Sequence, residues 1–403
     1  MLLQLTADQE ERCNRIDQLQ TEMMAGQGPD IFILPCDDGF GFNETRLIEN
    51  VEKGMVTGLF ADLSQLYDQD ETLEKDLLLE KVMDAGMMDG KRYILPLRYQ
   101  YPIILALEDE LQGAGLEISE LAQNSETFLS TVIAQEGNAW HVSGANVFAA
   151  NLSNVFPFLC DYNTGEVYLD EETLTDTLSQ YMELLSTLDQ ESIEADGTVW
   201  PYYLSPDRPL DTLFLSDDLF MYLDVAYAQY QELVAAPFAA QDGSIVANVS
   251  YYGAVSANCA AVEEAYEFLK LLLSKEVQSG GALEYNGASY DASEWGTAHG
   301  WPVRSDITAE ELRAAVPQAP LSNGMVEELR QPVEGEPAPM LPEEFFTEAY
   351  ERIVEVRPYT LLDGSFSRAA MSLYDFATFT PNTEQMDEVA EELLRQLETE
   401  VAE

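Results

Sequence analysis

The chain has 403 residues, of which 74 are acidic and 19 basic, so its formal net charge is -55 and its pI is about 4.1. A length above the roughly 250–300 residues that one hydrophobic core usually supports predicts two lobes. The large negative charge repels phosphate groups and anionic lipid, so we expect neither nucleic acid nor a membrane surface as a partner.

The first predicted elements are a helix and a strand. Residues 8–25 place apolar side chains at helical spacing, and Gly26 and Gly28 end the helix. The apolar run from Ile31 to Leu34 is typical of a parallel strand that is buried on both faces. A parallel sheet normally begins with a strand, and before this helix only residues 2–5 are strand-like. We therefore expect that the first strand of the sheet is missing from the chain.

The loop after this strand contains two adjacent carboxylates, Asp37 and Asp38. The loop lies at the carboxyl edge of the predicted sheet, which is where open α/β sheets bind ligands. Carboxylates accept hydrogen bonds from hydroxyl groups. At this point two interpretations of the loop stay open: it binds hydroxyl groups of a ligand, or it is a solvated acidic turn. Helices are predicted after the loop, over 44–53 and up to residue 85.

The segment from Asp89 to Leu107 is interpreted as the chain leaving one lobe and entering another. An Asp-Gly turn opens it, and a β-rich run begins at Tyr93. Because proline lacks an N–H donor, Pro96 and Pro102 are expected to prevent a strand from continuing through the loop between them. Three side chains of this loop are suited either to lining a ligand cleft or to packing beside a strand end: Arg98, Tyr99 and Tyr101.

The rest of the chain alternates helical and strand-like patterns. Helices are predicted over 117–135, 172–188, 343–356 and 383–402, and a strand over 245–252. The end of that strand is interpreted as a second crossing between the lobes. The segment at Trp301, which follows a glycine-rich loop, is interpreted as a third crossing.

Motifs for catalysis and metal binding are absent from the sequence. It has no G-x-S-x-G, P-loop or H-E-x-x-H motif, and His141 and His299 are too few for a histidine-rich metal site. We expect no metal, no cofactor and no catalytic activity. The four cysteines form no C-x-x-C pair, and their spacing leaves free thiols and one or two disulfides both open.

Several motifs in a fixed order carry a family resemblance. They are AGQGPDI from Ala25 to Ile31, GLFADL from Gly58 to Leu63, DGKRYILP from Asp89 to Pro96, VSAN from Val255 to Asn258, and GWPVR from Gly300 to Arg304. Their order and spacing resemble those of the family 1 extracellular solute-binding proteins, which are the sugar-capturing subunits of bacterial ABC importers.

The resemblance implies an α/β architecture, namely the two-lobed periplasmic-binding-protein-like (type II) fold with hinge crossings between the lobes. Residues 1–104 and 253–304 are expected to form lobe one, and residues 105–252 and 305–403 lobe two. The resemblance also implies a monomer without catalytic activity that presents a carbohydrate to the permease subunits of an ABC transporter. Family members are extracellular lipoproteins anchored to the membrane, although no signal peptide or lipobox is present in this chain.

Nine residues are predicted to contact the solute: Asp37, Asp38, Arg98, Tyr99, Tyr101, Trp140, Tyr251, Tyr252 and Trp301. Aromatic faces stack on sugar rings while carboxylates bind hydroxyl groups, so this set suits a neutral carbohydrate. Replacing Trp140 or Tyr252 by Ala is expected to weaken binding with little loss of the fold. Two other functions stay open, a binder of peptide or another polar solute and a carbohydrate-active enzyme with two carboxylates about 5–10 Å apart.

Overall fold

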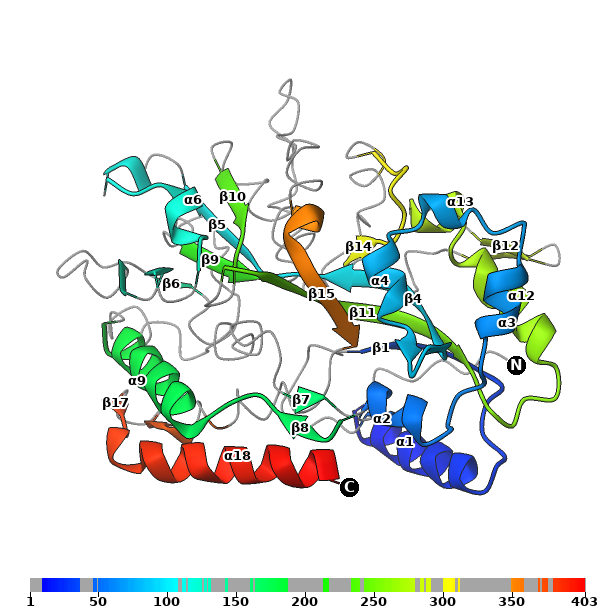
Figure 1. The fold of residues 1–403 in the computed structure, drawn as a ribbon, viewed down its shortest axis with the longest axis horizontal. Helices are drawn as coiled ribbons and strands as arrows, with labels where there is room; N and C mark the ends of the chain where they lie inside the picture. The colour runs from blue at the N-terminus through cyan, green and yellow to red at the C-terminus, as the bar shows by residue number, and fades with distance from the viewer. Residues whose placement is uncertain are drawn as a thin grey trace.

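The computed structural model describes the following residues: 9–36, 46–48, 50–107, 111–113, 115–124, 127–128, 130–131, 142–143, 160–161, 164–187, 213–216, 233–239, 243–279, 283–285, 288–290, 300–308, 311, 349–358, 369, 372–375 and 380–402. They form two main sheets with helices packed against them (Figure 1). Within these residues, no helix is long and apolar enough to cross a lipid bilayer.

The long strand β11, Ile245–Val255, is the centre of the first sheet and confirms the strand predicted over 245–252. It pairs antiparallel with β1 (Ile31–Pro35) and β4 (Ile94–Gln100), and β14 (Trp301–Pro302) pairs with β4. The prediction of a parallel β1 is wrong, because β1 runs antiparallel to β11. Its apolar run also overstated the burial of the strand, because only Phe32 is fully buried and the other residues of β1 are partly exposed.

The strand β15, Ile353–Pro358, joins the same sheet by pairing in parallel with the first half of β11. A helix was predicted over 343–356, and residues 349–352 are indeed helical. From Ile353 onwards the prediction is wrong. The β-branched residues Ile353 and Val356 are buried at the edge of β11, so sheet pairing outweighs the helical spacing of the sequence.

Helices cover the first sheet. They are α1 (Gln9–Met24), α2 (Val51–Val56), α3 (Ser64–Gln69), α4 (Glu80–Asp84), α12 (Val262–Leu271), α13 (Lys275–Gln278) and the 3-10 helix η1 (Lys75–Leu77). α12 packs directly on the backbone of β11, because a Cβ added at Gly253 would lie 2.7 Å from the Leu269 side chain. Tyr252 packs instead against Phe60, with the ring centroids 6.2 Å apart.

The Asp-Gly turn predicted before β4 is present between β2 (Met87–Met88) and β3 (Lys91–Arg92). Asp89 and Gly90 both have positive φ angles, 52° and 72°. Two consecutive positive φ angles are what a two-residue hairpin turn of type I′ requires, and Asp followed by Gly provides them at low steric cost.

The second sheet has the strand order β10 (Leu233–Pro237), β5 (Ile103–Leu107), β9 (Leu213–Ser216), β6 (Val142–Ser143). The short helix α6, Ile118–Leu121, lies within the region predicted to be helical over 117–135 and is in contact with β5 and β10. β5 and β10 are therefore held both by their own pairing and by this helix.

Two long helices, α9 (Glu171–Thr187) and α18 (Met386–Ala402), lie side by side below the second sheet in Figure 1. They confirm the helices predicted over 172–188 and 383–402. Their buried side chains recur at helical spacing and include Leu174, Leu178, Met182, Met386, Ala390, Leu393 and Leu397. Smaller elements are β7 (Cys160–Asp161), β8 (Glu166–Val167), β12 (Leu283–Tyr285), β13 (Ala288–Tyr290), β16 (Tyr374–Asp375), β17 (Thr380–Pro381) and η4 (Thr383–Gln385).

Candidate functional site

The chain passes between the two sheets at two adjacent places. β4 ends at Gln100 and β5 begins at Ile103, so only Tyr101 and Pro102 separate a strand of the first sheet from a strand of the second. β10 returns towards β11 beside this point, and the Phe238 N–H donates to the Pro102 carbonyl at 2.8 Å. The two connections are thus hydrogen-bonded to each other, and we call this region the crossing.

The prediction that proline would stop the strand before the crossing is wrong. β4 continues through Pro96, which lies opposite Tyr252 of β11. The register between the two strands shifts on both sides of Tyr251, which indicates β-bulges at this point. Proline is tolerated beside bulges because the regular ladder of hydrogen bonds is already interrupted there.

An aromatic cluster lies at the crossing. The rings of Tyr101 and Trp301 are stacked with centroids 5.8 Å apart and an angle of 14° between their planes, and the Tyr99 ring lies 6.1 Å from that of Tyr101. The cluster is buried, because Tyr99, Tyr101 and Trp301 are only 6%, 1% and 3% exposed. The sequence-based prediction therefore named three residues that the fold brings together, and their contact with a solute stays a prediction.

The two predicted tyrosines of β11 have different surroundings. Tyr251 is partly buried and lies opposite Arg98 on one side and Pro35 on the other. Tyr252 is 1% exposed and packs against Phe60. The burial of Tyr252 argues against the expectation that its replacement by Ala would cost little stability, because removing a buried aromatic ring leaves a cavity.

Arg98 points into the protein beside α13. Its guanidinium donates to the carbonyls of Gln278 at 3.0 Å and Val277 at 3.4 Å. Burial lowers the pKa of Arg98 to about 10, so the side chain stays charged near neutral pH. The carbonyls at the end of α13 supply the partial negative charge that a buried guanidinium needs. A contact between Arg98 and a solute stays a prediction.

Two buried hydroxyl groups near the crossing have no hydrogen-bond partner among the described residues, those of Tyr101 and Ser250. Ser250 was missed by sequence reasoning, since a single serine in a strand gives no signal. Ser250 lies at the bulge of β11. The residue before it, Val249, is opposite Pro358 of β15, and the residue after it, Tyr251, is opposite Pro35 of β1. β1 and β15 therefore run towards each other along β11, and their carboxyl ends meet at Ser250, midway along that strand.

The remaining predicted contacts, Asp37, Asp38 and Trp140, lie outside the described residues. Asp37 follows Cys36 directly in the sequence. The Cys36 N–H donates to the Ser250 carbonyl at 2.7 Å, so the chain is attached to β11 at Ser250 immediately before Asp37 and Asp38.

A buried glutamine that sequence reasoning missed holds the base of the crossing. Gln278 is 2% exposed, and its amide group donates to the carbonyls of Leu97 at 3.1 Å and Leu272 at 2.8 Å. Its side-chain oxygen accepts from the Val303 N–H at 2.9 Å. One side chain thus ties β4, the end of α12 and the segment after β14 together.

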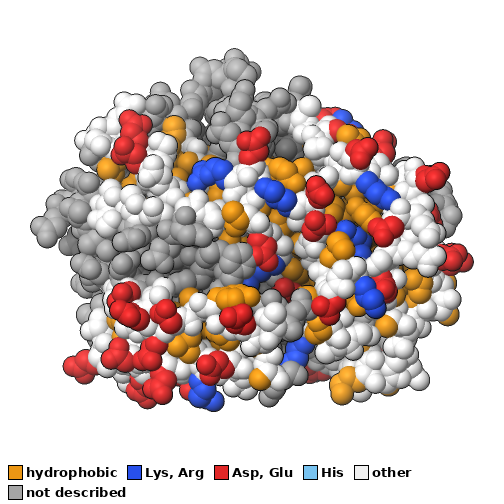
Figure 2. Space-filling view, in the orientation of Figure 1, with side chains coloured by type: hydrophobic (Ala, Val, Ile, Leu, Met, Phe, Trp, Pro, Cys, Tyr) orange, Lys and Arg blue, Asp and Glu red, His pale blue; other side chains and the backbone are white. Residues whose placement is uncertain are grey.

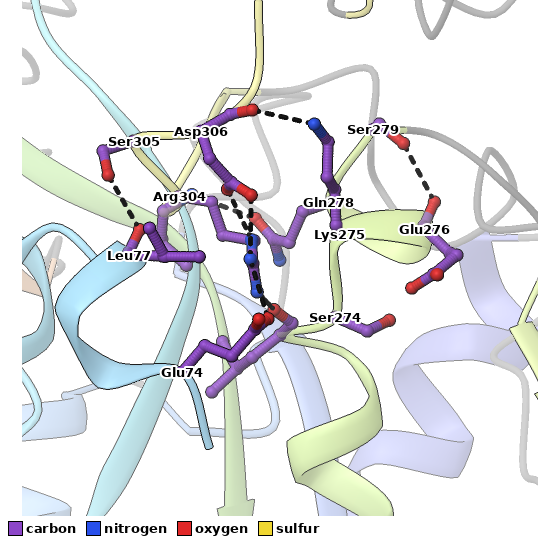
Figure 3. Close-up of polar contacts among 12 residues, drawn as sticks. Glu74, Leu77, Ser274, Lys275, Glu276, Gln278, Ser279, Arg304, Ser305 and Asp306 are labelled. Carbon is purple, nitrogen blue, oxygen red and sulfur yellow. Dashed lines mark hydrogen bonds and ion pairs between the residues drawn. The ribbon is translucent and has the colours of Figure 1, made fainter. Parts of the chain in front are cut away.

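Arg304 extends this polar network (Figure 3). Its guanidinium contacts Glu74 at 3.0 Å and Asp306 at 2.8 Å, and it donates to the Leu273 carbonyl at 3.2 Å. Hydrogen bonds to Asp306 raise the pKa of Arg304 and outweigh the effect of burial. The arginine of the GWPVR motif is therefore occupied by protein groups.

Lys81 performs a similar anchoring function at β15. Its Nζ donates to the carbonyls of Ile353 at 2.6 Å, Tyr350 at 3.2 Å and Glu351 at 3.3 Å, where a helical turn ends and the strand begins. A cation near the end of a helical turn satisfies carbonyls that have no partner within the turn. Sequence reasoning could not find this contact, because the partners are about 270 residues apart.

The charge on the surface is uneven. Figure 2 shows Asp and Glu side chains gathered over α9 and α18, at the lower left of the molecule. Among the described residues, no group of three or more His, Cys, Asp and Glu side chains is placed to hold a metal ion. Cys13, Cys36 and Cys259 form no disulfide with one another. The described part of the site thus consists of aromatic rings, hydroxyl groups and occupied cations.

Comparison with known proteins gives the fold. No family model matches the sequence, and neither does any curated protein. Solved structures do match, among them a family 1 extracellular solute-binding protein from Alicyclobacillus acidocaldarius, which is 14% identical with a TM-score of 0.58 over 96% of this chain and 87% of that chain. The chain therefore has the two-lobed α/β fold of the solute-binding proteins, and the resemblance predicted from the sequence is confirmed at the level of fold.

Some of the matching structures contain sugars. The galacto-N-biose/lacto-N-biose I-binding protein of an ABC transporter from Bifidobacterium longum, in complex with lacto-N-biose, is 13% identical, with a TM-score of 0.57 over 97% of this chain and 87% of that chain. An ABC transporter solute-binding protein from Thermotoga lettingae, bound to α-D-tagatose, is 13% identical, with a TM-score of 0.54 over 94% and 88%. Two other matching chains are described as de novo designed esterases.

Proposed function

We propose that this chain, with the fold of the solute-binding proteins, captures a sugar or oligosaccharide between its two lobes and delivers it to the permease of an ABC transporter. The observation that carries the proposal is the crossing, where two adjacent connections join two sheets beside an aromatic cluster. Two sheets joined by short connections can rotate about them, so that a solute is enclosed between the lobes.

The chemistry of the site favours a neutral solute. Tyr101 and Trp301 supply aromatic rings, which suit the apolar faces of sugars. Two of the cations described near the crossing, Arg98 and Arg304, already donate to protein carbonyls and carboxylates. An anionic solute would also have to enter the field of a chain with a net charge of -55.

The protein is proposed to bind its solute without converting it. A glycosidase would need two carboxylates facing each other across the cleft at about 5–10 Å. The predicted contacts form a set of stacking faces and hydroxyl acceptors instead. The proposal further includes a monomer that acts outside the cell as a membrane-anchored lipoprotein, as the resemblance implies. The proposed lobes follow the two sheets, so β11 and β15 belong to lobe one and not, as expected from the sequence, to lobe two for residues 245–252 and 353–358.

A thermal-shift screen tests this function. The purified chain is heated with neutral mono- and disaccharides, with uronic acids as negatively charged controls of matched size, and with di- and tripeptides. A solute that binds only the folded state raises the apparent melting temperature. We expect a rise with at least one neutral sugar and a smaller rise with its uronic acid. A rise with peptides alone, or release of a sugar product during incubation, would contradict the proposal.

A further inference from the structure

We infer that the hydroxyl of Tyr101 is a specificity-determining group that hydrogen-bonds an uncharged oxygen of the captured sugar at the crossing. The inference rests on the proposed function and adds to it the atom that selects the solute. The predicted function of Tyr101 as a lining residue requires only its ring, whereas this inference concerns its oxygen.

The first observation is the hydroxyl without a partner. Tyr101 is 1% exposed, and its hydroxyl makes no hydrogen bond with any residue that the structure describes. Buried hydroxyl groups are nearly always paired, because an unpaired one has lost water and gained nothing in return. A phenol without a partner at the place where a solute is expected indicates that the solute supplies the partner.

The second observation is the rigid position of the ring. The stacked Trp301 holds one side of Tyr101, with the Tyr99 ring 6.1 Å away. The backbone is fixed on both sides, because Gln100 pairs with Asn248 in the first sheet and Ile103 pairs with Pro237 in the second. A hydroxyl held in this way loses little conformational entropy on binding, so it can discriminate between positions of oxygen atoms on a sugar.

The third observation is the location between the sheets. Tyr101 is one of the two residues that separate β4 from β5, so movement of one lobe relative to the other acts on this residue directly. The hydroxyl is covered in the present conformation, so the inference includes a movement of the sheets at the crossing that opens it to the solute.

The protonation of the phenol defines the chemistry of its partner. Burial raises the pKa of Tyr101 well above its ordinary value, with a further contribution from Tyr99. The phenol therefore keeps its proton near neutral pH and donates a hydrogen bond. The matching group on the solute is an acceptor oxygen, and the negative charge of the chain favours a neutral hydroxyl or ring oxygen over a carboxylate.

Tyr101→Phe tests the inference, because it removes only this oxygen. The probe is whichever of maltose, cellobiose, xylobiose and lacto-N-biose gives the largest thermal shift with the wild-type chain. We expect calorimetry to show at least tenfold weaker binding of this probe by Tyr101→Phe. The melting temperature of the variant without sugar should equal or exceed that of the wild type, since a buried unpaired hydroxyl has been removed.

Tyr266→Phe is the matched control. The Tyr266 hydroxyl donates to the Asp70 carboxylate at 3.2 Å, away from the crossing, so this variant should lose stability and keep the affinity of the wild type. Deoxy forms of the probe provide a double-mutant cycle. One deoxygenation should weaken binding by the wild-type chain but have no further effect on Tyr101→Phe.

The outcomes separate the inference from the function on which it rests. Affinity of Tyr101→Phe within twofold of the wild type would overturn the inference while leaving the proposed function in place. A lower melting temperature with unchanged affinity would also overturn it, because the hydroxyl would then serve the fold. A wild-type chain that binds none of the sugars would overturn the proposed function and the inference with it.

Discussion

Trp301 lies with its ring stacked on that of Tyr101, at a centroid distance of 5.8 Å and an interplanar angle of 14°. Trp301 belongs to β14, which pairs with β4 of the first sheet, and Tyr101 belongs to the connection towards the second sheet. This stack therefore attaches β14, at the edge of the first sheet, to the connection between the two sheets. The same two rings serve the stability of the fold and, in our proposal, the binding of the solute.

Replacing Trp301 by Ala should lower the free energy of unfolding by about 3–5 kcal/mol, because the ring is 3% exposed and its loss leaves a cavity. Trp301→Phe keeps part of the ring and should lose less. Urea denaturation measures both variants. Met24, which is 91% exposed, provides the control, since Met24→Ala should change the free energy by less than about 0.5 kcal/mol. A loss below about 1 kcal/mol for Trp301→Ala would contradict the packing described here.

Gln278→Leu should destabilise the first lobe by about 3 kcal/mol or more. The variant has a similar volume, but it leaves the carbonyls of Leu97 and Leu272 and the N–H of Val303 without their side-chain partner in a buried place. Gln18→Leu is the matched control, because Gln18 bonds only to Glu22 on an exposed helix surface among the described contacts. Equal stability of the two variants in urea would show that the Gln278 network does not support the fold.

The comparison of sequence and structure shows what local patterns can report. Helical spacing located α1, α9 and α18, and the Asp-Gly pair located the turn before β4, because these features depend on neighbouring residues alone. The direction of β1 and the presence of β15 were predicted wrongly, because both depend on pairing with β11. The paired residues are far apart in the sequence, as Ile245 and Ile353 show. Pro96 was expected to end a strand and instead occupies a position beside a bulge of β11.

In the candidate site, too, the sequence predicted the features that motifs mark and missed those that depend on distant contacts. The order of the motifs led to Tyr99, Tyr101 and Trp301, which the fold does bring together. Ser250 and Gln278 gave no signal, since their positions depend on where distant strands end and on which backbone groups lack partners.

Lys81→Met should loosen the start of β15. The substitution removes three hydrogen bonds to the carbonyls of Tyr350, Glu351 and Ile353. We expect faster amide hydrogen exchange in residues 353–358 than in the wild type, with smaller changes in β1. Lys91→Met is the control, because among the described residues the Lys91 side chain forms only a surface ion pair, with Asp62 at 3.7 Å, and such pairs contribute little. Exchange in β15 that is unchanged by Lys81→Met would contradict the anchoring function.

The carboxylate of Asp70 should give the fold a pH-dependent contribution. Burial alone would raise the pKa of Asp70, but hydrogen bonds from Thr72 and Lys270 outweigh burial and hold it well below its ordinary value. The contribution is therefore fully present above about pH 4, where the unfolded chain is also ionised, and is lost as the pH falls below that value towards the folded-state pKa.

Asp70→Asn measures this contribution when it is compared with the wild type at the same pH, since the general repulsion among the acidic residues then largely cancels. We expect the variant to be less stable by about 1–3 kcal/mol at pH 7 and the difference to shrink at pH 3. Asp17→Asn, on the exposed surface of α1, should change stability by less than about 0.5 kcal/mol at both values. A difference for Asp70→Asn that stays constant with pH would rule out the depressed pKa.

Isothermal titration calorimetry of the wild-type chain with the best neutral disaccharide from the screen tests the proposed capture of a sugar most directly. We predict saturable binding of one sugar per chain and recovery of the intact sugar after the titration. A flat titration with every neutral sugar, or recovery of a cleaved sugar, would contradict it.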